Sequence, residues 1–194
     1  MNIVERVKKI ILQPKQEWQV IDGETHTVQG LYTQYVMILA AIPAVCGFIG
    51  FSLIGIGVFG ATYRVPIAAG VAHMVVQYIL SLGMVYVFAL IIDALAPSFA
   101  SQKNFNQALK VAAFMPTPAW IAGIFSIIPA LSIIGALLSL YSLYLLFVGL
   151  PILMKTPQDK SIPYTVVVII AAIVMAVVIA AIVGLTMPGP VRGF

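Results

Sequence analysis

The sequence predicts an all-α integral membrane protein, a bundle of five transmembrane helices with a short amphipathic interfacial helix at its N-terminus. Hydrophobic residues make up 62% of the 194 positions and charged residues only 8%, whereas a soluble domain carries about a quarter charged residues. Such a chain cannot cover its surface with polar side chains, so a bilayer must supply much of its solvent. Five apolar stretches reach the roughly 20 residues that a helix needs to cross a membrane.

The predicted order of parts is a cytoplasmic N-terminal segment over 1–30, a membrane domain over 31–187 and an external tail over 188–194. The five spans are nearly continuous apolar stretches, predicted at about 35–59, 66–95, 108–129, 132–154 and 164–187. The second would be roughly 45 Å long as a helix, so it must tilt, kink or project past the hydrocarbon. The fifth is nearly pure Val, Ile and Ala, which predicts a lipid-facing wall.

The N-terminal residues Asn2 to Leu12 place their aliphatic side chains on one helical stripe. Three basic residues lie off this stripe: Arg6, Lys8 and Lys9. The pattern predicts a helix that lies in the headgroup region against anionic lipid, or one that packs on the cytoplasmic face of its own bundle. Trp18 follows as the expected interfacial anchor.

The first span ends in Gly55-Ile-Gly57-Val-Phe-Gly60, which matches the GxGxxG fingerprint of dinucleotide-binding proteins. That fingerprint requires a preceding strand and a βαβ unit. Here it closes a membrane helix, so we expect flexible backbone at a helix end and no nucleotide site.

Polar side chains inside the second span suggest contacts with other helices. His73 and Gln77 are four residues apart and share one helical face, and polar groups at that depth are expected to point away from lipid. A buried His73 is expected to stay neutral and to bond a neighbour, the alternative being a proton relay. Asp93 is expected in an interfacial ion pair or helix-end contact.

The third span is interrupted by Met115-Pro116-Thr117-Pro118-Ala119-Trp120. The two prolines remove two backbone donors and block regular helix, which indicates either an internal site or a kink that shapes packing. If there is an internal ligand site, the candidate residues are those predicted at membrane depth on the second, third and fourth spans: His73, Gln77, Pro116, Pro118, Trp120 and Tyr144.

Several functions find no support in the sequence. The motifs GxSxG and HExxH do not occur, so no catalytic residue is predicted. A single cysteine, Cys46, has no ligand partner at motif spacing, and His26, expected to be solvated in a polar turn, is far from His73 in sequence. No metal site, cofactor or nucleic-acid interface is therefore predicted.

The basic residues predict the orientation of the five spans. Eight lie in the N-terminal segment and in the second and fourth loops, and two lie on the opposite side: Arg6, Lys8, Lys9, Lys15, Lys103, Lys110, Lys155 and Lys160, against Arg64 and Arg192. Cytoplasmic loops carry the excess of basic residues. We therefore expect a cytoplasmic N-terminus and an external C-terminus.

The chain resembles the Yip (Ypt-interacting protein) family, in its bacterial inner-membrane branch, at three sets of residues. They are Pro14…Trp18…Ile21, Pro118-Ala-Trp120 with Gly123, and Tyr141…Tyr144…Gly149-Leu-Pro151, and the resemblance covers nearly the whole chain. It implies a multi-pass inner-membrane protein. Eukaryotic members are trafficking factors that bind Rab-type GTPases and shape or sort vesicle membranes. Their Asp-Leu-Tyr-Gly-Pro motif is absent here, so Rab binding is not carried over.

Two functions follow from these observations. The first is a non-enzymatic membrane scaffold that binds lipids, a second copy of itself or another membrane protein, motivated by the basic N-terminal helix and the resemblance. The alternative is a small-solute or ion channel or transporter with a polar site around His73, motivated by His73, Gln77 and the break at Pro116 and Pro118.

Overall fold

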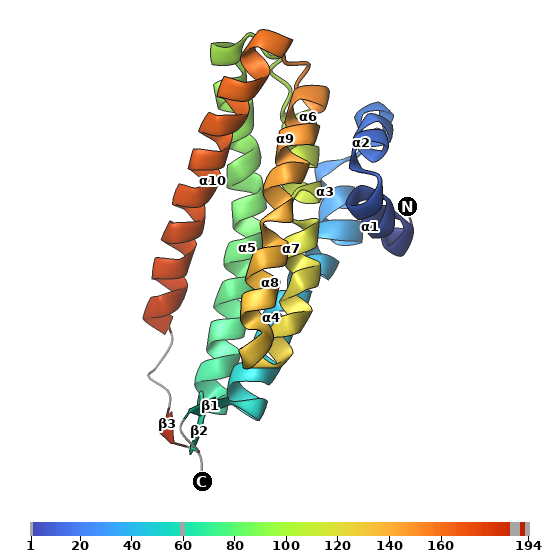
Figure 1. The fold of residues 1–194 in the computed structure, drawn as a ribbon. Helices are drawn as coiled ribbons and strands as arrows, with labels where there is room; N and C mark the ends of the chain where they lie inside the picture. The colour runs from blue at the N-terminus through green and yellow to red at the C-terminus, as the bar shows by residue number, and fades with distance from the viewer. Residues whose placement is uncertain (1, 59–60, 187–190, 193–194) are drawn as a thin grey trace.

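The second span is one unbroken helix, α5 (Ile67–Leu95), along which much of the bundle packs. The structure, a computed structural model, describes residues 2–58, 61–186 and 191–192. Within these residues, five helical segments are long and apolar enough to cross a membrane: Val28–Ile54, Ile67–Phe99, Phe105–Ile127, Pro129–Leu153 and Gln158–Leu185. They run side by side in one bundle (Figure 1), so the predicted all-α membrane bundle is confirmed.

Most spans are assembled from several helical pieces. Two short helices precede them, α1 (Ile3–Leu12) and α2 (Pro14–Gly23). The first span comprises α3 (Val28–Leu31), η1 (Tyr32–Val36), α4 (Met37–Phe48) and η2 (Ile49–Ile54). The second comprises α5 and η3 (Ala96–Phe99). The third comprises α6 (Phe105–Phe114), α7 (Thr117–Ala122) and η4 (Gly123–Ile127). The fourth and fifth comprise η5 (Pro129–Leu131), α8 (Ser132–Ser139) and α9 (Tyr141–Leu153), then α10 (Gln158–Thr186).

The third span is the centre of the bundle and the fifth is its edge. In the most apolar stretch of each span, 72% of the third is buried inside the protein but only 6% of the fifth. Helix α10 packs on α5 and α9 with one face and leaves the other uncovered. This arrangement agrees with the predicted lipid-facing wall, because an uncovered Val, Ile and Ala surface is stable only in hydrocarbon.

The first span ends at Ile54, earlier than the predicted position 59, because the chain turns into a β-hairpin. Strands β1 (Ile56–Val58) and β2 (Ala61–Arg64) pair antiparallel, and β3 (Val191–Arg192), from the predicted external tail, adds to β2. Gly55 makes the turn into β1 with a φ of 88°, a left-handed conformation that favours glycine. The GxGxxG match thus falls at a helix end followed by a hairpin, and its last two positions lie outside the described residues.

Close helix contacts in the core depend on small residues. A Cβ atom added at Gly123 would lie 2.6 Å from Cβ of Pro43, the proline inside α4. The backbones of η4 and α4 can therefore approach closely at this point, as small residues allow between membrane helices.

Candidate functional site

The helix pair α1–α2 is anchored on the bundle by the indole of Trp18. This side chain is fully buried and meets the ring of Phe114 edge to face, with centroids 6.4 Å apart. Its other side lies against α9, where a Cβ added at Gly149 would come within 2.4 Å of Cε2 of Trp18. The expected interfacial position of Trp18 is therefore wrong: the ring fills the core between α2, α6 and α9, because glycine on α9 leaves room for it.

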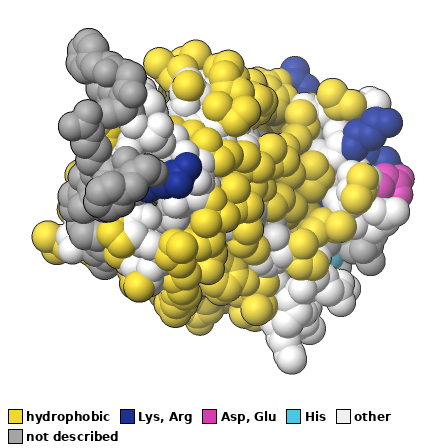
Figure 2. All heavy atoms as spheres, turned by 90° about the horizontal axis from the view of Figure 1, so that it is seen from below, with side chains coloured by type: hydrophobic (Ala, Val, Ile, Leu, Met, Phe, Trp, Pro, Cys, Tyr) yellow, Lys and Arg dark blue, Asp and Glu magenta, His cyan; other side chains and the backbone are white. Residues whose placement is uncertain are grey.

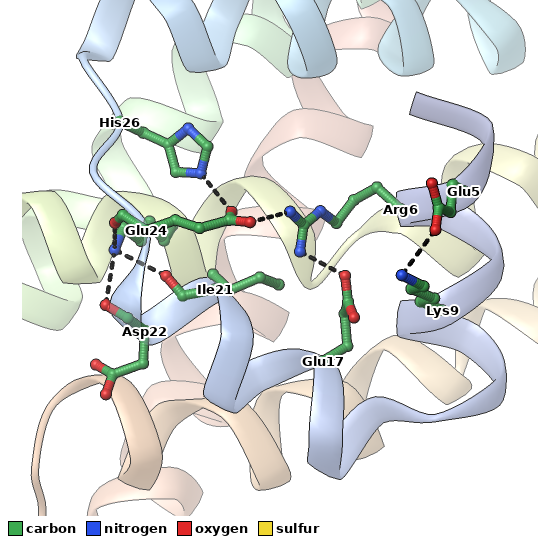
Figure 3. A network of polar contacts seen from close by, with 9 residues as sticks. Glu5, Arg6, Lys9, Glu17, Ile21, Asp22, Glu24 and His26 are labelled. Atoms are coloured by element: carbon green, nitrogen blue, oxygen red, sulfur yellow. Dashed lines mark hydrogen bonds and ion pairs between the residues drawn. The ribbon is translucent and has the colours of Figure 1, made fainter. Parts of the chain in front are cut away.

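A charged cluster centred on Arg6 lies between α1, α2 and the loop that follows (Figure 3). The two terminal nitrogens of Arg6 donate separately, Nη1 to Oε1 of Glu17 and Nη2 to Oε1 of Glu24. The guanidinium carbon also lies 5.8 Å from the centre of the Phe114 ring, a cation–π distance. Arg6 was expected on the membrane-facing surface, but its side chain is only 8% exposed because these two carboxylates draw it inward.

Glu24 links this cluster to His26. The Nε2 atom of His26 lies 2.9 Å from Oε2 of Glu24, and its ring tilts against Phe114 at 6.2 Å. The expectation of a solvated His26 is wrong, because this contact draws the ring into the junction. Burial alone would raise the pKa of Glu24, but hydrogen bonds from Arg6 and His26 outweigh it and hold that pKa below its ordinary value of 4.5.

Lys110, inside the third span, binds the C-terminal end of α2. Its buried Nζ donates to the carbonyl oxygens of Ile21 at 2.9 Å and Asp22 at 3.2 Å, and to that of Glu24. The last carbonyls of a helix have no partner within it and carry partial negative charge. The ammonium therefore satisfies them and fixes α2 to α6.

Two further contacts hold the same end of α2. Gln107 donates from Nε2 to Oδ1 of Asp22 at 3.0 Å, and Lys155, in the loop before α10, forms an ion pair with Asp22. Charged and polar groups from α6 and the last loop therefore converge on one short segment. A polar cavity of about 230 Å³ opens beside it.

The break in the third span has its own buried hydrogen-bond chain. Pro118 has no N–H to serve the carbonyl of Phe114, four residues earlier. The hydroxyl of Thr117 donates to that carbonyl at 2.6 Å and accepts from the Tyr35 hydroxyl at 2.7 Å. Because the freed carbonyl is satisfied by protein, the break is stable at membrane depth.

The two polar regions that the sequence singled out do not meet. Pro116 and Trp120 line an apolar hollow of about 220 Å³ between α5, the third span and α10, whose other walls include Val85 and Met175. Neither His73 nor Gln77 is among the described residues that line it. His73 is about 18 Å below Val85 along α5 and interacts with the backbone of Val183 on α10.

The remaining predicted residues fall in different places. Pro118 is buried at the break, while Tyr144 on α9 is 41% exposed and pairs with Tyr141 at 5.3 Å. Lys8 and Lys9 are exposed on α1. The apolar stripe of α1 packs on the bundle core, which is the second of the two arrangements that its sequence allowed.

Sequence reasoning missed Glu17, Glu24 and the role of Lys110. Lys110 carried a usable signal, because a lysine within an apolar span needs a partner. The two glutamates carried none, since nothing in their spacing pairs them with Arg6. Across the described part of the chain, no cluster of three His, Cys, Asp or Glu side chains could hold a metal ion.

Comparison with known proteins identifies the family. The Yip1 domain model matches residues 8–180. The chain belongs to the Yip1 domain family. It is similar to the inner membrane protein YohC of Escherichia coli K12 and of E. coli O6:H1 strain CFT073, each 27% identical over 156 residues, or 78% of this chain and 80% of the relative. No solved structure matches it. With its five apolar helices, it is a multi-pass inner-membrane protein of the Yip1 family.

Proposed function

We propose that this Yip1-family protein is a non-enzymatic membrane scaffold whose N-terminal helix pair presents a fixed surface to lipid headgroups or to a membrane protein. The observation that carries this proposal is the buried Arg6 cluster. Arg6, Glu17 and Glu24 are engaged with one another between α1 and α2. Charged groups committed to holding two elements together favour a structural role over a catalytic one.

The outward face of the pair has the chemistry of a headgroup-binding surface. Lys8 and Lys15 are exposed there, together with a Glu5–Lys9 pair at 2.7 Å. The aliphatic side chains of Val4 and Leu12 are exposed between them. Basic and aliphatic side chains side by side on one helix suit the boundary between anionic headgroups and acyl chains.

We also propose that this surface faces the cytoplasm. The end of the bundle that holds the α5–α6 and α9–α10 loops, the loop end, is tied to α2 by Lys155 and Asp22. It carries Lys103 and Lys155 in its loops and Lys160 in the first turn of α10, whereas Arg64 lies at the hairpin end. An excess of basic residues at one end favours a cytoplasmic location for that end.

The test is native mass spectrometry of protein released from nanodiscs that contain equal phosphatidylglycerol and phosphatidylcholine. The wild type should retain more phosphatidylglycerol, and the triple variant K8Q/K9Q/K15Q should lose this preference. The variant K103Q/K160Q removes exposed charge from the loop end instead and should keep the preference. Equal retention in all three proteins would overturn the headgroup-binding role.

The transport alternative is tested separately. It was motivated by His73, Gln77 and the break at Pro116 and Pro118, and neither His73 nor Gln77 is among the described residues that line the hollow beside Pro116. A proton flux into proteoliposomes that His73→Leu abolishes would favour transport over the scaffold. Equal flux in the two proteins is expected.

A further inference from the structure

The apolar surface that faces lipid extends over a different length of the bundle axis on two opposite sides, the α1–α2 side and the α10 side. Helices α1–α2 cover one side, and α10 forms the opposite side (Figure 1). Viewed from the hairpin end, charged side chains gather at the edge where Figure 1 places α1, while much of the remaining outline is apolar (Figure 2). The charged surface of α1 and the apolar surface of α10 therefore face different parts of the surrounding bilayer.

Two contacts fix the depth of α1. The Tyr141 hydroxyl donates to the carbonyl of Ile11 at 2.9 Å, and Tyr141 is about 18 Å below the end of α9 at Leu153. Helix α1 also packs against α7, which begins about 18 Å below the start of α6 at Phe105. The exposed charges of α1 therefore lie near mid-height of the bundle.

Helix α10 stays apolar above that level. Tyr164 fixes its height at the loop end, through a hydrogen bond to the carbonyl of Ile92 and stacking on Phe99 at 4.9 Å. Val166 and Val167, about 12 to 14 Å below the start of α10 at Gln158, are 47% and 36% exposed. These side chains require hydrocarbon around them at a level above the charges of α1.

A flat bilayer of uniform thickness fits only one side. A boundary at the loop end would leave Lys8, Lys9 and Glu5 deep in hydrocarbon, where charges are costly. A boundary at the level of α1 would leave Val166 and Val167 in water.

Tilting the protein does not remove this conflict. On the α1 side, the apolar surface extends about 20 Å from Pro129 to Tyr141 and about 26 Å from Met37 to Ile54. On α10 it extends about 32 Å from Tyr164 to Leu185. A rigid tilt shifts both ends of one side together, so it cannot make these heights equal.

We propose that the lipid-facing belt of this protein is stepped, and that the leaflet beside α1–α2 is locally thinned so that its headgroups reach α1. The partner is the bilayer itself, with headgroups around Lys8 and Lys9 and acyl chains around the full length of α10. This inference goes beyond the proposed scaffold and does not rest on it, because the step follows from helix heights and holds in either orientation.

The test compares single cysteines in a Cys46→Ala background, in nanodiscs that expose both faces to a membrane-impermeant maleimide. Lys8→Cys is placed on α1, and Val166→Cys on α10, nearer the loop end. Because thiolate is the reactive form and charge is disfavoured in hydrocarbon by about 3 kcal/mol, a shielded cysteine should react roughly a hundredfold more slowly.

The stepped belt predicts that Lys8→Cys reacts at the rate of the reference Gln158→Cys, while Val166→Cys reacts as slowly as Ile134→Cys on α8. Fast labelling of both test sites would mean that the whole loop end projects into water, and would overturn the proposal. Slow labelling of both would mean that hydrocarbon covers α1, and would also overturn it. Headgroup preference is measured separately, so the scaffold proposal and this one can fail independently.

Discussion

The indole of Trp18 lies directly on the backbone of Gly149. A Cβ at position 149 would lie 2.4 Å from Cε2 and 2.6 Å from Cδ2 of that ring, which is closer than unbonded carbon atoms approach. The contact joins α2 to α9, two elements far apart in sequence, and both residues belong to the sets that resemble the Yip family. In this protein, these two residues of the resemblance form one physical contact.

Replacement of Gly149 by alanine should destabilise the protein. Overpacking typically costs about 1–3 kcal/mol, offset by up to about 1 kcal/mol from the better helix propensity of alanine. The midpoint of thermal unfolding in mild detergent measures the net loss. Gly83→Ala is the control, because an added Cβ there meets nothing within 4 Å. Equal midpoints for the two variants would contradict the contact.

Replacement of Arg6 by methionine should loosen the N-terminal helix pair. The change leaves Glu17, which is 6% exposed, without its cation, and removing one partner of a buried ion pair costs about 3–5 kcal/mol. Limited proteolysis should cut the first 27 residues faster than in the wild type. Lys8→Met, at an exposed position on the same helix, should not change the rate. The double variant R6M/E17Q should recover part of the protection, and no recovery would argue against the pairing.

Replacement of Lys110 by methionine should release the end of α2. The carbonyl of Glu24 loses its donor, whereas that of Ile21 keeps the Glu24 N–H and that of Asp22 keeps Nε2 of Gln107. A buried group left unsatisfied costs about 1–3 kcal/mol. Amide hydrogen exchange over residues 18–25 should accelerate. Lys103→Met removes an exposed lysine just before α6 and should leave that exchange unchanged; comparable acceleration in both variants would exclude a specific role for Lys110.

Acid should weaken the same junction through Glu24. Its pKa is held below the ordinary 4.5 by hydrogen bonds from Arg6 and His26 that outweigh its burial. A lowered pKa contributes stability that is fully present above 4.5 and is lost as the pH falls through the folded-state pKa. Protease protection of the first 27 residues should therefore fall below about pH 4.5. Glu24→Gln should show weaker protection at neutral pH and a smaller further loss in acid, and an unchanged acid response would remove Glu24 as its cause.

Removal of the Thr117 hydroxyl should destabilise the break in the third span. Thr117→Val leaves the Phe114 carbonyl and the Tyr35 hydroxyl without this partner, at a cost of about 1–3 kcal/mol. Tyr35→Phe deletes the outer hydroxyl and keeps the bond that satisfies the carbonyl, so it should cost less. A larger loss of thermal stability for Tyr35→Phe would contradict the order of this chain.

Some features could be read from sequence because they depend on local composition. The apolar stretches predicted five spans, and the composition of residues 164–187 predicted that the fifth is an uncovered wall. Pro116 and Pro118 predicted the break where α6 gives way to α7, since the missing N–H groups interrupt the helix wherever it packs. These features depend on solvent transfer and backbone geometry, and not on which helices become neighbours.

Tertiary structure decided which polar groups meet. Arg6, Lys8 and Lys9 are all basic residues that lie off the apolar stripe of α1. Arg6 nevertheless turns inward, because Glu17 and Glu24 lie opposite it. Trp18 is buried because α9 presents a glycine to it. His73 lies about 18 Å along α5 from Val85, which lines the hollow beside Pro116. Composition fixes the medium that each helix requires, whereas a contact between distant residues depends on helix order, height and rotation, which are set only when the elements pack together.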